Sequence, residues 1–331
     1  MRNILLITLL SITALFSCKG ESEHVVSPEE LAKQDSAALH VAVFPCKVCL
    51  PLYYAEATGI FQSLDVDIRL MHLSTMEDCD TALLNHRAEV ATSDLARLIC
   101  MTKDGNDVTA IAQMQGKTFL MTRPEKPILN IKKLKERLIA LDRHSETDYF
   151  SDKLAKEVGL EQLDFFRTQI NNHQLRYSML TNCLYEAAFL DEPYATLAEE
   201  MGCHTLWESS KKDTCTWNVL AMTNKTLKDK SRANQASKLI DAYQLAVERM
   251  NENMDTLCLD SIIKKVYQLP HIQVDTIISI HPNSEIYRAS KLLVPQKTEV
   301  ETAKQWLLER KWIPATLNTE KITNDILMKK Q

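Results

Sequence analysis

The residues with the clearest capacity for chemistry are Cys46 and Cys49, which form a C-x-x-C pair in a proline-bounded loop. Two thiolates at this spacing can bind zinc or copper, form a disulfide, or cycle as a redox pair. The pair supplies only two of the four ligands that zinc usually takes, and the sequence offers no second pair. Three interpretations stay open: a disulfide or simple thiols that shape a pocket, a soft-metal site, and redox chemistry.

A second candidate pair, Ser93 and Asp94, falls at the carboxyl end of a short apolar strand predicted over 90–92. The cysteine pair follows another predicted strand, over 39–44, in which apolar residues alternate. In open α/β sheets, ligands bind outside the carboxyl ends of the strands. We therefore expect both pairs to face one crevice.

Short apolar strands and helical stretches alternate along the chain, which predicts an α/β protein. One helix is expected to end at Gly59, because glycine tolerates the left-handed conformation of a helix end. The expected strands are 39–44, 66–70, 90–92, 108–112 and 138–141, and the expected helices include 52–61, 78–86, 175–183 and 227–253.

The motifs "YYAEATGIF", "LDVDIRL", "ALLNHRAEVATSDL", "IKKLKERLIAL" and "FLDEPYATLAEEMG" occur in an order that resembles the solute-binding proteins of ABC importers for taurine, nitrate and thiamine-pyrimidine precursors. The resemblance covers roughly residues 39–225. It implies a periplasmic-binding-protein type II fold, in which two α/β lobes are joined by a two-segment hinge. Residues 39–115 and 222–331 would form a discontinuous first lobe, and residues 116–221 would form the second.

In the relatives, the turn that holds Arg143 and Ser145 often contributes to ligand binding. Ser145 suits a helix N-cap, and a helix N-terminus favours an anion. In this chain, Glu146 and Asp148 already place negative charge in that turn. This departure weighs against a direct transfer of sulfonate or nitrate specificity, although Arg143, and Lys47 across the cleft, could offset the charge.

The motif "DEPY" resembles a family turn between a strand and a helix, and it places Glu192 and Tyr194 near the ligand. Trp217 lies in the segment that would return the chain to the first lobe, where it could form a pocket wall. The candidate ligand-binding residues are Cys46, Lys47, Cys49, Ser93, Asp94, Arg143, Ser145, Glu192, Tyr194 and Trp217.

Residues 1–17 combine a positive charge at Arg2 with an apolar run and end in Leu15-Phe16-Ser17-Cys18. The run is shorter than the ~20 apolar residues of a membrane-spanning helix, which favours a cleaved signal peptide. Its ending resembles the bacterial lipoprotein signal and implies a lipid on Cys18, followed by a polar, flexible tether over 18–38. The alternative is an ordinary secretory signal in which the cysteine occurs by chance.

Composition narrows the function. A net charge of -5 gives no electrostatic footprint for nucleic acid. The six glycines form no phosphate loop or dinucleotide fingerprint, so no cofactor is expected. The sequence also shows no nucleophile elbow, no HExxH pair and no paired-carboxylate motif of the hydrolase type, which lowers the expectation of an enzyme.

We therefore predict a monomeric, lipid-anchored substrate-binding protein in the periplasm or cell envelope. It would capture a small-molecule solute by hinge closure and deliver it to an ABC transporter permease and its ATPase. Two alternatives stay open. One is a metal-binding or chaperone protein that uses Cys46 and Cys49. The other is an enzyme on the same fold, since relatives include a thiamine-pyrimidine synthase and menaquinone-pathway proteins.

Overall fold

The computed structural model describes residues 33, 35–209, 216–252, 256–269 and 289–327. The predicted signal peptide, Cys18 and most of the predicted tether lie outside the described residues. The described end of the tether, 35–37, is helical rather than irregular. The chain divides into two compact units, 1–37 and 38–331, and everything described below belongs to the second unit.

The first of two five-stranded sheets has the order β2-β1-β3-β10-β4. Its β1 pairs in parallel with β2 and β3, whereas β10 runs antiparallel to β3 and β4. The strands β3 and β4 are buried along their whole length, as expected in a sheet covered by helices. The strands are β1 Leu39–Val43, β2 Ile68–His72, β3 Val90–Asp94, β4 Val108–Gln113 and β10 Asn218–Thr223.

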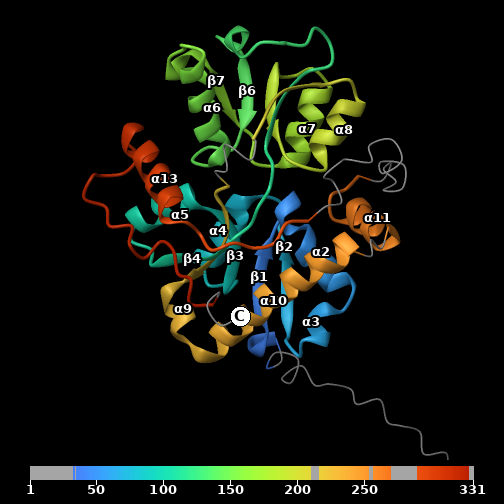
Figure 1. Ribbon diagram of the computed structural model, residues 1–331, viewed down its shortest axis with the longest axis vertical. Helices are drawn as coiled ribbons and strands as arrows, with labels where there is room; N and C mark the ends of the chain where they lie inside the picture. Colours follow the sequence, from blue (N-terminus) through green and yellow to red (C-terminus); the bar gives the residue numbers. More distant parts are fainter. Residues whose placement is uncertain (1–32, 34, 210–215, 253–255, 270–288, 328–331) are drawn as a thin grey trace, which may run out of the picture. The chain divides into compact units, whose positions relative to one another are not determined.

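Helices from both ends of the sequence pack with this sheet to form the first lobe (Figure 1). Gly59, with φ of 71°, ends the first long helix as predicted, and a short helix follows at once. The helices of this lobe are η1 Lys47–Cys49, α2 Leu50–Ala57, α3 Ile60–Ser63, α4 Met76–Leu84, α5 Leu95–Lys103, α9 Asn224–Lys228, α10 Lys230–Glu252, α11 Thr256–Lys265 and α13 Lys297–Glu309.

The second sheet, with the order β7-β6-β8-β5-β9, is the centre of the second lobe. Its edge strand β9, a half-buried stretch, is not predicted from the sequence. The strands are β5 Phe119–Thr122, β6 Leu138–Leu141, β7 Phe166–Gln169, β8 Ala187–Leu190 and β9 His204–Glu208. The helices are η2 Ile131–Leu134, α6 Glu146–Glu157, η3 Gln162–Asp164, α7 His173–Thr181 and α8 Tyr194–Glu200.

In the part of the chain that the structure describes, the two sheets are connected between β4 and β5 and again before β10 (Figure 1). Because β5 already belongs to the second sheet, the first crossing lies within 114–118. All of β10, from Asn218 onward, pairs in the first sheet. The expected boundary between residues 221 and 222 therefore falls inside a strand of the first lobe.

The segment around α13 also joins the lobes. Arg310, which follows α13, places its Nε 2.7 Å from Asp152 Oδ2 and its Nη2 3.2 Å from Asp148 Oδ1 on α6. Trp306 donates from Nε1 to Asp152 Oδ2 at 2.8 Å. The Asp148 side chain is fully buried, so this is an ion pair of the interior rather than a screened surface contact. The sequence assigned no such role to the C-terminal helices.

Candidate functional site

The loops that follow β1, β3, β6 and β8 meet between the lobes. There they enclose a cavity of about 50 Å³, which we call the small cavity. This is the place where ligands bind in α/β sheets, outside the carboxyl ends of strands. The polar side chains that line it come from both lobes. They are Lys47, Asp94, Lys117, Thr118, Asp142, Ser145, Glu146, Thr147, His173, Arg176, Asp191 and Asn218.

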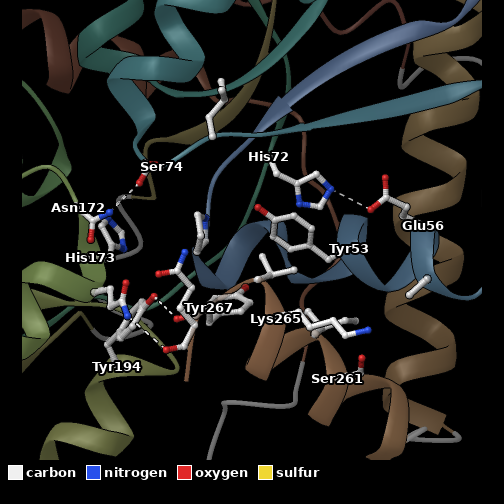
Figure 2. A pocket seen from close by; sticks show the side chains of 17 residues that line it. Tyr53, Glu56, His72, Ser74, Asn172, His173, Tyr194, Ser261, Lys265 and Tyr267 are labelled. Atoms are coloured by element: carbon white, nitrogen blue, oxygen red, sulfur yellow. Dashed lines mark hydrogen bonds and ion pairs between the residues drawn. The ribbon is translucent and has the colours of Figure 1, made fainter. Parts of the chain in front are cut away.

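A larger cavity of about 580 Å³, which we call the large cavity, lies beside it and shares His173 (Figure 2). Its volume falls within the 300–1,000 Å³ range of small-molecule sites. Tyr53, Tyr194 and Tyr267 supply aromatic walls, and the buried Tyr53 hydroxyl has no hydrogen-bond partner in the described part of the chain. The cavity is thus large enough for an organic molecule and offers it both aromatic and polar contacts.

A chain of charged groups lies where the two cavities meet. His173 Nδ1 is 2.7 Å from Asp191 Oδ1, and its Nε2 is 3.4 Å from Asp142 Oδ2. Arg176 Nη1 donates to the same Asp142 oxygen at 2.9 Å. Burial alone would lower the pKa of His173, but the adjacent carboxylates, Asp191 first, outweigh it and hold that pKa above its ordinary value.

Direct contacts hold this network to the first lobe. Lys47, at the start of η1, donates its backbone N–H to Asp191 Oδ2 at 3.0 Å. At the rim of the large cavity, Asn172 Nδ2 donates to Ser74 O at 3.4 Å, and the two residues come from opposite lobes (Figure 2). A solute held by residues of both lobes would therefore stabilise their approach.

Two further carboxyl groups, those of Asp94 and Glu146, line the small cavity and meet across the lobes. Asp94 Oδ2 accepts the backbone N–H of Glu146, the first residue of α6, at 2.9 Å. Glu146 Oε2 accepts the Trp217 N–H at 2.6 Å, and its Oε1 accepts the Thr118 hydroxyl at 3.0 Å. Burial raises the pKa of Asp94 to about 7 and that of Glu146 to about 8.

The cysteine pair lies on the first-lobe side of the cleft, at the N-caps of η1 and α2. Cys46 lines the small cavity, whereas Cys49 is fully buried behind it, with Sγ 3.2 Å from Thr92 Oγ1. Burial raises the pKa of the Cys46 thiol. For Cys49 burial acts in the same direction, but hydrogen bonds with Cys46 and Thr92 outweigh it and lower the pKa. Within the described ranges, no group of three or more His, Cys, Asp or Glu residues is arranged to hold a metal ion.

The structure brings five of the ten candidate ligand-binding residues to a cavity. Cys46, Lys47, Asp94 and Ser145 line the small one, and Tyr194 lines the large one. Ser145 is the N-cap of α6, as predicted, since its side chain accepts the Thr147 N–H.

The other five line neither cavity, because each side chain makes other contacts. Cys49 lies behind Cys46, as described above. Ser93 donates from Oγ to Asp80 at 2.6 Å, and Arg143 Nε lies 3.2 Å from Asp148. The Glu192 carboxylate accepts the N–H and hydroxyl of Thr196 within α8. Trp217 reaches the site through its backbone N–H, while its buried ring packs beside Tyr149 and Trp306.

Four residues of the two cavities were not predicted from the sequence: His173 and Arg176 of the charged network, and Tyr53 and Tyr267 of the aromatic walls. His173 and Arg176 follow the carboxyl end of β7, so the carboxyl-end rule used for Asp94 could have identified them. Tyr267 gives no comparable signal. It belongs to the C-terminal region, and its hydroxyl donates to Cys46 O, 221 residues away in sequence, at 2.7 Å.

Two mixed α/β lobes whose strand ends face a shared cleft define the periplasmic-binding-protein fold, which confirms the predicted fold class. The family model described as NMT1/THI5 like matches residues 47–256. This match spans more than half of the chain, and the protein therefore belongs to the NMT1/THI5-like family. No curated protein sequence matches it.

Solved structures give the same fold at low sequence identity. The periplasmic aliphatic sulphonate binding protein SsuA from Escherichia coli is 12% identical, with a TM-score of 0.69 over 88% of this chain and 99% of that one. The periplasmic nitrate-binding protein NrtA from Synechocystis PCC 6803 is also 12% identical, with a TM-score of 0.72 over 89% and 88% of the two chains. A zinc-bound ligand-binding component of an ABC-type import system from Staphylococcus aureus is 13% identical, with a TM-score of 0.70 over 88% and 98%. At such identities the likeness establishes the fold alone.

Proposed function

We propose that this protein is the substrate-binding component of an ABC importer, which captures a small solute between its lobes and delivers it to the permease and its ATPase. The observation that carries the proposal is the pair of adjoining cavities, lined from both lobes and sharing His173. Two structural relatives, one that binds aliphatic sulphonates and one that binds nitrate, support such a role.

Hinge closure is the mechanism that this geometry supports. The lobes are linked by two crossings, at 114–118 and before β10, and the ligand-side contacts of Lys47 and Asp191 form only when the lobes meet. A solute that contacts both lobes binds the closed form better than the open form, and this difference in affinity drives closure. The permease would then recognise the closed form. Capture in this proposal needs no chemical turnover and no resident cofactor.

The N-terminal sequence supports the proposal that the protein is a lipoprotein of the cell envelope. The apolar run and Leu15-Phe16-Ser17-Cys18 would direct export, cleavage before Cys18 and lipid attachment to that cysteine. Among the described residues, no helix is long and apolar enough to cross a bilayer. In cells, Cys18→Ala should release the protein from the membrane fraction; protein that stays membrane-bound would contradict the lipid anchor.

Solute capture can be tested before the solute is known. The small-molecule fraction of the producing organism, added to the purified protein, should raise the melting temperature and reduce the radius of gyration. A ligand at about 100 times its Kd stabilises a protein by about 2.7 kcal/mol, which is on the order of a few degrees for a chain of this size.

A variant of the cleft and a matched control decide where the solute binds. Asp191→Ala removes the acceptor of Lys47 N–H and the partner of His173, so it should abolish both responses. Asp164→Ala removes a half-buried, ion-paired aspartate of the same lobe outside both cavities and should leave both responses intact. Equal responses from the two variants, or none from the wild-type protein, would refute solute capture in this cleft.

A further inference from the structure

We propose that Asp94 sets the ligand specificity of the cleft by occupying the position that a small oxyanion would take at the N-terminus of α6. This inference rests on the proposed function and deepens it, because it names a class of solutes, the small oxyanions, that the cleft rejects. The group that a solute places beside the N-terminus of α6 is then neutral or cationic.

The first observation is the way Asp94 bridges two helix N-termini. Its Oδ1 accepts the Ala96 N–H at 2.8 Å and so caps α5 of the first lobe. Its Oδ2 accepts the Glu146 N–H at 2.9 Å, which is the first amide of α6 in the second lobe. Unpaired amides and the helix dipole make a helix N-terminus an anion site. Here a carboxylate of the chain itself fills that site.

Two further amides of this turn are also paired within the chain. Ser145 Oγ accepts the Thr147 N–H at 3.2 Å, and Ser145 O accepts the Tyr149 N–H at 3.1 Å. With the Glu146 amide bound to Asp94, an oxyanion would have to displace a buried carboxylate before it could reach the helix.

The second observation concerns the acidic groups beside the N-terminus of α6. Glu146 adds a second buried carboxyl group to the small cavity, and its hydrogen bonds go to Trp217 and Thr118. Within the described ranges, neither Asp94 nor Glu146 forms an ion pair with a cationic side chain. At neutral pH the buried Glu146 carboxyl holds its proton, because its pKa is about 8. The negative charge that an entering oxyanion would meet at the N-terminus of α6 is therefore that of Asp94, which forms no ion pair with a cation among the described residues.

The third observation concerns a buried donor in the same cavity. Arg176 is 1% exposed, lines the small cavity, and has no acceptor for its Nε in the described part of the chain. Asp142 already pairs with this guanidinium through Nη1. Because that charge is neutralised, an uncharged acceptor such as a carbonyl oxygen of the solute is enough to satisfy Nε.

Substitution of Asp94 tests the proposal. Asp94→Ser keeps a good N-cap for α5 but is too short to reach the Glu146 amide, so it vacates the oxyanion position. Asp94→Asn keeps a carbonyl oxygen in that position and removes the charge. Binding of sulfate, methanesulfonate and nitrate to the full-length protein would be measured by isothermal titration calorimetry.

We expect the wild-type protein to bind none of the three anions measurably. Access to a helix N-terminus is worth up to about 2 kcal/mol, so Asp94→Ser should gain about 10- to 30-fold in oxyanion affinity. Asp94→Asn should gain much less. Asp229→Asn, at a capping aspartate of α10 outside the cleft, is the matched control and should gain nothing.

Wild-type binding as tight as that of Asp94→Ser would overturn the proposal, and so would a folded Asp94→Ser protein without any gain. If Asp94→Ser does not fold, as judged by circular dichroism, Asp94→Thr repeats the test with another short N-cap residue. Oxyanion binding by the wild-type protein would refute the specificity claim while supporting solute capture. Absence of any solute response in the wild-type protein would refute solute capture. The oxyanion affinities of the Asp94 variants would still show whether Asp94 blocks the N-terminus of α6.

Discussion

Replacing Glu146 with glutamine should stabilise the protein, and the gain should depend on pH. The Glu146 carboxyl is buried, and its pKa rises from 4.5 to about 8. Between these two values the folded protein holds a proton that the unfolded chain has released, so the wild-type free energy of unfolding falls as pH rises through that window. Because glutamine does not titrate, the free energy of unfolding of the Glu146→Gln variant does not fall with pH for this reason.

The magnitude follows from the pKa shift. Each pH unit between the two pKa values costs about 1.36 kcal/mol, so at pH 7 the penalty on Glu146 is about 3 kcal/mol, and above pH 8 it approaches about 5 kcal/mol. The glutamine side chain of the variant can preserve the packing. Its Oε1 can accept the Trp217 N–H, while its Nε2 donates to the Thr118 hydroxyl. Glu146→Gln should therefore exceed the wild-type stability by about 3 kcal/mol at pH 7 and by almost nothing at about pH 4.5.

Urea unfolding followed by tryptophan fluorescence, at pH values of about 4.5, 7 and 8.5, measures these differences. Glu301→Gln, at an exposed glutamate of α13, is the control and should change stability by less than about 0.5 kcal/mol at each pH. A gain that is the same at all three pH values, or a loss that grows with pH, would refute the reasoning.

Three further predictions concern contacts in and around the cleft. Arg310→Ala leaves buried Asp148 short of one partner and should cost about 3 kcal/mol in urea unfolding, whereas loss of the exposed Lys291 pair should cost less than about 1 kcal/mol. Equal costs would contradict an interior ion pair. Gly116→Ala places a methyl group 2.9 Å from Val48 Cγ1 and should destabilise the protein by about 1–3 kcal/mol, and adding Val48→Ala should recover part of this cost. A double variant no better than the single one would exclude that clash. The raised pKa of His173 means that its ion pairs stabilise the protein fully below the ordinary histidine pKa and are lost as pH rises through the folded pKa. His173→Gln should therefore flatten the fall in melting temperature above about pH 6.5, and an unchanged pH profile would contradict this.

Local patterns predicted most of the elements because each pattern reports local burial. The strand over 138–141 and the helix capped by Ser145 occur as expected, since an apolar run and an N-cap residue act within a few positions. The edge strand β9 was missed because its half-buried residues mix polar and apolar types. They show neither the alternation of a strand nor the 3.6-residue period of a helix clearly. The C-terminal contacts of Arg310 and Tyr267 were missed because they join residues far apart in sequence.

The sequence predicted where the site lies in the fold, but not which individual side chains line it. The rule that ligands bind at strand ends brought Cys46 and Asp94 to the same cavity. It could not tell that Ser93 would donate to Asp80, or that the Glu192 carboxylate would accept the N–H and hydroxyl of Thr196. Those outcomes depend on which partner each buried polar group finds in three dimensions, which sequence spacing does not encode.

Native mass spectrometry of the protein isolated from its own organism tests solute capture most directly. We predict a non-covalently held organic molecule that leaves on denaturation and is absent from Asp191→Ala but present in Asp164→Ala. A protein that carries no such molecule in any preparation, and whose radius of gyration does not change with the organism's small-molecule fraction, would contradict the proposed function.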